Sequence, residues 1–387
     1  MLATQALATM AAYSLPAVAP AVALDLGVPG ALVGVFISTV YGVGIISALL
    51  SPGFIVRYGA VRVSQVVLLA TLAMLLATAS GSVGSIALGA VLLGLAYGAT
   101  APASAHLLVP RTPPAVINLV LSLRQIGVPL GGVLAGLAMV PLTLAIGWRD
   151  ALLLQALPVF ALLLLIQIPR RHWDRERDPG RRILNRRIAA PLLLLVESRA
   201  IRRLAFASFV YSGLQLCFIS FMTVHLTSRA GFGLIVAGQA LAVYQVAGAV
   251  SRPIWGWLAD RFLPARLLLA AQGVIMCAAA VLAGRFAPEW SQAWVLWVCT
   301  VAGATASGFT GIAYAEWARL GSARRTEATG LGAGMMFTGV MVMPSAFSAT
   351  VTLAGDYAIA YSGAGLLAAV AGLMLLGGSG QRPPSSS

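Results

Sequence analysis

The amino-acid sequence predicts an all-α membrane protein with twelve transmembrane helices in two six-helix bundles. Hydrophobic residues make up 59% of the 387 residues, charged residues make up only 9%, and the mean hydropathy is +0.92. In soluble domains roughly a quarter of the residues are charged, so this composition excludes an ordinary soluble protein. The one long charged stretch, residues 169–203, lies between two hydrophobic regions of nearly equal length.

Each hydrophobic region contains six apolar segments of about 20 residues, the length that crosses ~30 Å of hydrocarbon. In the first region, residues 1–168, the segments lie near 3–24, 31–52, 63–80, 85–108, 116–140 and 150–168. In the second region, residues 204–387 with a short tail, they lie near 204–226, 234–256, 266–284, 292–313, 328–350 and 357–378. Twelve spans put both termini on one side of the membrane.

The stretch 169–203 contains eleven of the 25 arginines, a charge density that cannot lie in hydrocarbon. We therefore expect an aqueous linker between two membrane bundles. Alternating spans place 21 arginines on the side of the linker, including Arg252 at a helix end, and three on the other side, with Arg124 inside a span. Because positively charged loops stay in the cytoplasm, the linker and both termini are expected to be cytoplasmic.

The cationic and sulfur-containing residues exclude several functional classes. The formal net charge is +14, but the arginines gather in loops as membrane topology requires, so nucleic-acid binding is not predicted. The chain has no lysine, which excludes a Walker A lysine and Schiff-base chemistry within this polypeptide. The three cysteines lie in apolar segments without ligand spacing, so we expect no metal site and no cofactor.

Two similar loops follow the second and eighth spans. They read PGFIVRYGAVR at 52–62 and GWLADRFLPAR at 256–266, 204 residues later. The second loop, from Gly256 through Asp260 and Arg261, resembles the motif A loop G-x-L-A-D-R-x-G-R-[KR] of the major facilitator superfamily, and departs from it at Leu263. The first copy keeps Arg57 and Gly59, but has Pro52 for the leading glycine and Val56 for the aspartate.

The resemblance implies two bundles that rock about a central site, which opens to each side in turn. In the family the motif aspartate interacts with a neighbouring helix N-terminus and an arginine and latches the cytoplasmic side, and a carboxylate is favourable at that positive helix end. We assign this gating role to Gly256, Asp260 and Arg261, and to Arg57 and Gly59 in the first copy. Since Val56 cannot serve as the aspartate does, the first-half latch should be weak or absent. A monomer in the bacterial inner membrane is expected.

Arg124 is the sharpest candidate for substrate binding. If the fifth span begins near Val116, eight residues place Arg124 roughly 12 Å deep, close to the midplane. Such an arginine needs a wet cavity, a carboxylate, backbone carbonyls or an anionic ligand. The first-half spans contain no acid, because Asp25 and Asp150 lie at outer ends. We favour an arginine that binds a substrate carboxylate; the alternative is a structural arginine bonded to carbonyls or to tyrosine and glutamine side chains.

Neutral polar residues inside the spans are candidates to complete the site. The proposed set is Gln125, Tyr13, Tyr97, Tyr211, Gln215 and Tyr244, and further polar residues in the spans are Tyr41, Gln239 and Gln245. Tyr211 and Gln215 are four residues apart and so share one face of the seventh helix, which lines the cavity in the family. Taken singly, each residue also suits hydrogen bonding between helices. His106 and His225 lie toward the inner and outer ends of their spans, with no positioned carboxylate.

The sequence therefore predicts a secondary transporter that moves a small organic anion through the lipid bilayer, with or without a coupling ion. An alternative within the superfamily is an exporter of hydrophobic drugs, because GVPLGG at 127–132 looks somewhat like the G-P-x-x-G-G motif of drug antiporters. Alternatives of another class are a non-transporting sensor or scaffold and a membrane enzyme. An enzyme is disfavoured, since neither H-E-x-x-H nor G-x-S-x-G occurs.

Overall fold

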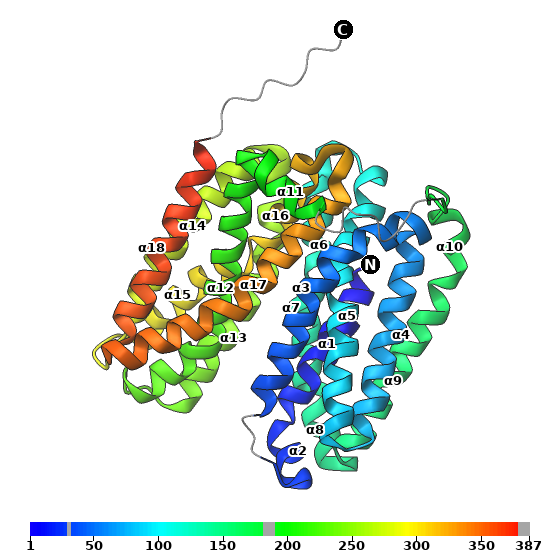
Figure 1. The fold of residues 1–387 in the computed structure, drawn as a ribbon. Helices are drawn as coiled ribbons and strands as arrows, with labels where there is room; N and C mark the ends of the chain where they lie inside the picture. Colours follow the sequence, from blue (N-terminus) through cyan, green and yellow to red (C-terminus); the bar gives the residue numbers. More distant parts are fainter. Residues whose placement is uncertain (29–31, 181–189, 378–387) are drawn as a thin grey trace.

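The computed structural model describes residues 1–28, 32–180 and 190–377, and these are helical almost throughout, with no strand among them. The helices form two bundles that lie side by side, one before the linker and one after it (Figure 1). The predicted all-α fold in two bundles is therefore confirmed.

The first bundle corresponds to the first six predicted spans. Its first span is divided at Val18 into two helices, since Pro16 near the end of the first one cannot continue the hydrogen-bond ladder. The elements are α1 (Leu2–Ala17), α2 (Ala19–Leu26), α3 (Leu32–Tyr58), α4 (Ala60–Ala79), α5 (Val83–Leu108), η1 (Val109–Arg111), η2 (Pro114–Val116), α6 (Ile117–Gln125), α7 (Gly127–Leu134), η3 (Ala135–Met139), α8 (Val140–Ile146) and α9 (Trp148–Leu165).

The second bundle corresponds to the other six predicted spans. Its elements are α12 (Arg199–Ser228), α13 (Leu234–Arg261), α14 (Ala265–Gly284), α15 (Gln292–Ala302), η4 (Gly303–Ser307), α16 (Thr310–Gly321), η5 (Ser322–Arg324), α17 (Arg325–Ala354) and α18 (Tyr357–Leu376). Within the described residues, nine helical stretches are long and apolar enough to cross a membrane, and one of them, Gln292–Ala354, runs through two predicted spans. The two remaining predicted spans correspond to α1 with α2, and to α13.

The linker is partly helical. It contains α10 (Gln167–Trp173) and α11 (Ala190–Glu197), whereas residues 181–189, with four of the eleven linker arginines, lie outside the described residues. α12 begins at Arg199 and so includes the last five residues of the predicted linker, because the Ser198 side chain caps the helix by accepting a hydrogen bond from the Ile201 amide at 3.3 Å.

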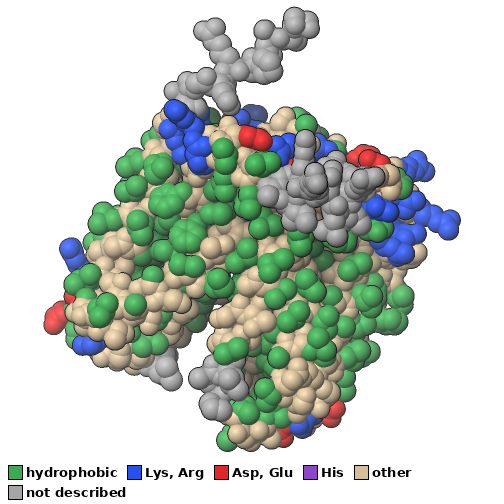
Figure 2. All heavy atoms as spheres, in the orientation of Figure 1, with side chains coloured by type: hydrophobic (Ala, Val, Ile, Leu, Met, Phe, Trp, Pro, Cys, Tyr) green, Lys and Arg blue, Asp and Glu red, His purple; other side chains and the backbone are tan. Residues whose placement is uncertain are grey.

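The two bundles touch near the linker and diverge at the opposite end (Figure 1). We call the end that carries α10 and α11 the linker end. There α17 packs against α3 and α5, and α13 and α16 pack against α6. Gly330 of α17 makes the close approach possible, since a Cβ at this position would lie 2.5 Å from the Ala48 carbonyl oxygen of α3. Figure 2 shows a notch between the bundles at the end opposite the linker.

Candidate functional site

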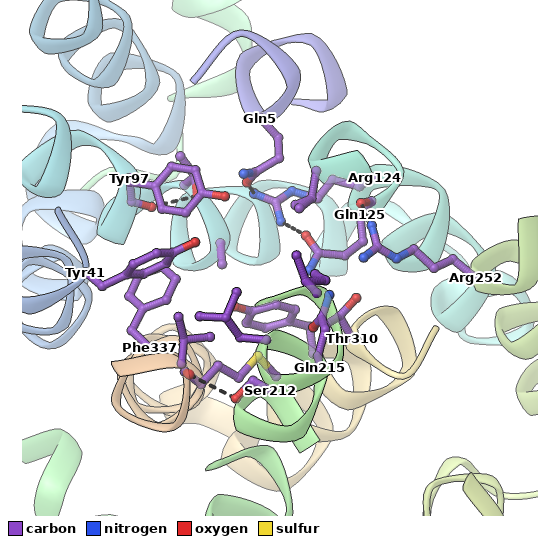
Figure 3. Close-up of a pocket in the computed structure, with 18 of the residues that line it drawn as sticks. Gln5, Tyr41, Tyr97, Arg124, Gln125, Ser212, Gln215, Arg252, Thr310 and Phe337 are labelled. Atoms are coloured by element: carbon purple, nitrogen blue, oxygen red, sulfur yellow. Dashed lines mark hydrogen bonds between the residues drawn. The ribbon is translucent and has the colours of Figure 1, made fainter. Parts of the chain in front are cut away.

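A cavity lies between the two bundles and encloses about 720 Å³ of empty space, part of it open to solvent (Figure 3). Its polar lining comes from both bundles: Gln5, Tyr13, Tyr41, Tyr97, Thr100, Arg124 and Gln125 from the first, and Ser212, Gln215, Arg252, Thr310 and Tyr314 from the second. All eleven acidic residues of the chain are described, and none of them lines the cavity. The cavity therefore contains two cations without a carboxylate.

Arg124 lies at the cavity wall and is only 5% exposed. Its Nε donates to Ser104 Oγ at 3.0 Å, its Nη2 donates to Gln5 Oε1 at 2.7 Å, and its Nη1 donates to Gln125 Oε1. These partners come from α5, α1 and α6, and all are neutral. Arg124 thus faces the central cavity, and side chains of neighbouring helices also hold it.

Arg252 is a second buried guanidinium, 1% exposed, on the opposite side of the boundary between the bundles. Its Nε donates to the Ser307 carbonyl at 3.0 Å and its Nη2 to Ser307 Oγ at 3.2 Å, while its Nη1 donates to the Gln125 carbonyl. The sequence analysis placed Arg252 at a cytoplasmic helix end, which is wrong. α13 continues to Arg261, so Arg252 lies nine residues, or roughly 14 Å, inside the helix.

Pro129 explains why the Gln125 carbonyl is free to accept from Arg252. In a regular helix this carbonyl would accept a hydrogen bond from the amide four residues later. That residue is Pro129, which has no N–H. The side chain of Gln125 accepts from Arg124 and its backbone from Arg252, so one residue joins both guanidinium groups (Figure 3).

Aromatic rings form another part of the lining. The rings of Tyr41 of α3, Tyr97 of α5 and Phe337 of α17 contact one another, with centroid distances of 6.3 Å for Tyr41–Tyr97, 5.5 Å for Tyr41–Phe337 and 5.7 Å for Tyr97–Phe337. The Tyr97 hydroxyl lies 3.1 Å from Thr9 Oγ1. Phe337 therefore brings the second bundle into contact with two rings of the first.

The cavity brings together five of the seven residues proposed for substrate binding. Tyr13, Tyr97, Arg124, Gln125 and Gln215 line it. Tyr211 and Tyr244 do not, and both are fully buried in the core of the second bundle. The Tyr211 hydroxyl donates to the Leu269 carbonyl at 2.8 Å and the Tyr244 hydroxyl to the Gln215 carbonyl at 3.3 Å. Although Tyr211 and Gln215 are one turn apart, the Tyr211 side chain reaches a carbonyl of α14 inside the second bundle, and only Gln215 lines the cavity.

Sequence reasoning missed several lining residues. They are Gln5, Thr100, Ser212, Arg252, Thr310, Tyr314 and Phe337, whereas Tyr41 was named among the polar span residues but left out of the proposed set. For Arg252 a signal existed, since it lies four residues inside the predicted span 234–256. For Phe337 none existed, because a phenylalanine in an apolar span looks like any lipid-facing or core residue.

Asp260 makes the contact with a neighbouring helix N-terminus that the motif resemblance implies. Its Oδ1 accepts hydrogen bonds from the Asn118 amide at 3.0 Å and from Asn118 Nδ2 at 2.7 Å, and its Oδ2 accepts from the Leu119 amide at 2.8 Å. These amides begin α6, so the carboxylate of the second bundle lies at the positive end of a first-bundle helix. Gly256 allows the approach, since a Cβ there would lie 2.7 Å from the Asn118 carbonyl oxygen. Arg261 is exposed.

In the first copy of the motif, the carboxylate comes from the linker instead. Asp174 Oδ1 accepts from the Val61 amide at 2.9 Å and Oδ2 from the Arg62 amide at 3.0 Å, at the start of α4. Gly59, at φ +97°, lies so close to Asp174 that a Cβ would overlap the carboxylate. Arg57 lies over the Tyr58 ring at 5.6 Å. This carboxylate ties the linker to the first bundle and does not join the two bundles.

Near the linker end of the first bundle, a histidine contacts the second bundle. His106 Nδ1, at the linker end of α5, lies 2.8 Å from Thr326 Oγ1 in the first turn of α17. At the linker end, the polar contacts described between the bundles are thus those of Asp260 with the start of α6 and of His106 with the start of α17.

Comparison with known proteins places this architecture in a family. The family model of the Major Facilitator Superfamily matches residues 1–333. The fold is similar to that of the E. coli fucose:proton symporter (16% identity, 98% of each chain covered, TM-score 0.76) and of the human organic anion transporter MFSD10 (16%, 97% of each chain, 0.77). It is also similar to a bacterial homologue of the iron transporter ferroportin in an outward-facing state (15%, 98% of this chain and 100% of that chain, 0.75).

No curated protein matches the chain by sequence. The family match nevertheless covers most of the chain, and the structural neighbours are transporters with different cargoes. The chain therefore belongs to the major facilitator superfamily, as a multi-pass membrane transporter of small-molecule substrates and not an enzyme.

Proposed function

We propose that this protein is a secondary transporter that carries a small organic anion by rocker-switch alternating access, and that the anion binds between Arg124 and Arg252. The observation that carries the proposal is the pair of buried guanidinium groups, one from each bundle, in a cavity that no acidic residue lines. Buried cations normally require a compensating charge, and an incoming anion would supply it.

The hydrogen-bonding capacity of the two arginines supports this role. A guanidinium has five N–H donors, and three of them are used in the bonds described for Arg124 and for Arg252. Two donors on each residue are available for the oxygens of a carboxylate, which arginine binds in a planar, bidentate manner. Because the arginines belong to different bundles, an anion bound by both would draw the bundles together.

The distribution of arginines supports a cytoplasmic linker end, with both termini inside a bacterial inner membrane. In that orientation the bundles are closed on the cytoplasmic side and diverge toward the outside, and Asp260 latches the closed side. The similar folds are those of a fucose:proton symporter, an organic anion transporter and a bacterial homologue of an iron transporter, so the fold leaves the cargo open. The proposal of an anionic cargo therefore depends on Arg124 and Arg252. We expect the unit to work as a monomer.

The likeness of residues 127–132 to a drug-antiporter motif has a packing explanation. A Cβ at Gly127 would lie 2.8 Å from the Leu2 carbonyl oxygen, and one at Gly131 would overlap the Ala6 carbonyl. These glycines therefore let α7 approach α1 within the first bundle, so they do not favour an exporter over an anion carrier.

Uptake into proteoliposomes tests the proposal. A panel of radiolabelled carboxylates is offered to the wild type and to Arg124→Gln and Arg252→Gln. Each substitution should lower kcat/KM about 10- to 150-fold, because a hydrogen bond to a charged group contributes about 1.5–3 kcal/mol. Arg229→Gln, at an exposed arginine, is the matched control. Undiminished carboxylate flux in both cavity variants would overturn the proposal.

A further inference from the structure

The cavity lining also bears on the part of the transported anion that carries no charge, which we call its body; this inference rests on the proposed function. The cavity lining is divided into a charged side and an apolar side. Arg124, Gln125 and Arg252 form the charged side on α6 and α13, whereas Leu216 and Ile219 of α12 and Met336, Phe337 and Val340 of α17 form the apolar side. Figure 3 shows the two arginines across the pocket from Tyr41 and Phe337.

The ring of Phe337 is held in a fixed place by the first bundle. It stacks on Tyr97, with an angle of 23° between the ring planes, and meets Tyr41 at a steeper angle of 63°. A Cβ at Gly44 of α3 would lie 3.2 Å from this ring, so the absence of a side chain at Gly44 makes room for it. Such aromatic pairs stabilise a structure beyond the effect of the area they bury. The aromatic surface is therefore preorganised and borders the cavity directly.

The apolar side lies farther from the linker end than the charged side. Arg124 is seven residues from the start of α6 and Arg252 nine residues from the end of α13, roughly 10 and 14 Å along those helices. Phe337 is twelve residues from the start of α17 and Tyr41 seventeen from the end of α3, roughly 18 and 26 Å. A solute that enters from the open end would place its anionic head at the arginines and its body beside the rings.

This arrangement discriminates between classes of anion. A second carboxylate, or the hydroxyls of a sugar acid, would meet the side chains of Ile219, Met336 and Val340, which offer no hydrogen-bond partner. The polar residues of α12 in this lining, Ser212 and Gln215, carry no charge and already donate to the Met336 carbonyl and to Ser307 Oγ. Burying an unpaired polar group is unfavourable, and burying an unpaired charge is more so. A flat hydrocarbon body gains free energy on the same surface. We propose that the substrate is a monocarboxylate with a ring-sized apolar body, and that Phe337 and Tyr41 select that body.

Four solutes of graded chemistry test the inference in proteoliposomes. Phenylacetate has the head and the body, acetate only the head, succinate a second charge, and phenylacetamide the body without charge. We expect the KM for phenylacetate to be at least about tenfold below that for acetate, because burial of an aromatic side chain contributes about 1.5–3 kcal/mol. Succinate should be no better than acetate.

Substitution at the ring gives the residue-level test. Phe337→Ala should raise the KM for phenylacetate about tenfold, while the KM for acetate changes by less than about twofold. Tyr41→Phe keeps the ring and should keep the preference. Phe221→Leu is the control, because the Phe221 ring stacks on Phe347 at 4.7 Å outside the cavity lining. Since both solutes are compared within one variant, a loss of folded protein cancels in the ratio.

The outcomes separate this inference from the proposed function. Equal KM values for acetate and phenylacetate in the wild type, or an unchanged preference in Phe337→Ala, would overturn the inference and leave the anion transporter intact. If phenylacetamide is carried as well as phenylacetate, the proposed function itself fails and a carrier of hydrophobic compounds takes its place. Absence of flux for every carboxylate would overturn both.

Discussion

The guanidinium of Arg252 donates a hydrogen bond to the backbone carbonyl of Gln125 and so joins the two bundles at the wall of the central cavity. The same Gln125 accepts a bond from Arg124 through its side chain. Because Pro129 removes the helical partner of this carbonyl, the bond between bundles replaces one that a regular helix would make internally. In the alternating-access mechanism proposed above, movement of one bundle against the other would break or rebuild this network, and the proposed site would thereby be coupled to the transport step.

Replacing Arg252 with lysine tests whether the fork of the guanidinium is required. Lysine keeps the charge but presents a compact ammonium group that cannot reach both Ser307 and Gln125 in a planar arrangement. We expect Arg252→Lys to lose transport about 10-fold or more, from the loss of at least one charged hydrogen bond. The measurement is KM and kcat for carboxylate uptake, with Arg229→Lys as control. Full activity of Arg252→Lys would show that only charge matters.

The Asp260 latch predicts a shift between conformations. Asp260→Asn replaces one acceptor oxygen with an NH₂ group, which faces an amide donor instead of accepting from it. A loss of about 1–2 kcal/mol would shift the population of the state closed at the linker end roughly 5- to 30-fold. Spin labels at Ala115 and Leu263, exposed residues of different bundles, should report longer distances.

Asp174→Asn is the matched control for that experiment. It removes the same carboxylate chemistry from a helix N-terminus, but Asp174 ties the linker to α4 within the first bundle. Its distance distribution should equal that of the wild type. A shift of equal size in both variants would mean that Asp260 has no special role between the bundles.

Close packing at Gly256 predicts that an added methyl group disturbs the contact between α13 and α6 and that the same change elsewhere in α13 does not. Gly256→Ala places a Cβ 2.7 Å from the Asn118 carbonyl oxygen, so α13 must move away from α6. Overpacking typically costs about 1–3 kcal/mol, and we expect a lower Tm together with reduced uptake. Gly238→Ala, in the same helix with nothing within 4 Å of the new Cβ, should leave both quantities unchanged. An unaffected Gly256→Ala variant would contradict the packing described.

The His106 contact predicts a weaker gate on the side where Val56 replaces the aspartate. Thr326→Val removes the hydroxyl that lies 2.8 Å from His106 Nδ1, and Thr326→Ser retains it. We expect the valine variant to destabilise the state closed at the linker end by about 0.5–1.5 kcal/mol. This is less than for Asp260→Asn, because no carboxylate takes part in the bond. The same spin-label distances measure it. Identical behaviour of the valine and serine variants would exclude a gating role for this bond.

Much of the fold could be predicted from hydrophobic length and arginine placement, because a bilayer imposes both. Arg124 could be identified from the sequence because a charged side chain inside a membrane span requires a polar partner or ligand. Asp260 could be identified because it belongs to a recognisable loop motif. Arg252 was misplaced because α13 continues five residues beyond the predicted apolar segment 234–256, to Arg261. Asp174 was missed since the return of the linker onto Gly59 leaves no periodic pattern, and Tyr211 was misassigned because neighbouring helices decide which face meets the cavity.

Calorimetric binding of phenylacetate to the purified protein tests the central claim most directly, with the wild type, Arg124→Gln, Arg252→Gln and Arg229→Gln compared under one condition. An anion site between the two arginines predicts a Kd raised about 10- to 150-fold in each cavity variant and changed by less than about twofold in Arg229→Gln. If the cavity variants bind phenylacetate as tightly as the wild type and differ only in Tm, the arginines are structural and the claim is contradicted.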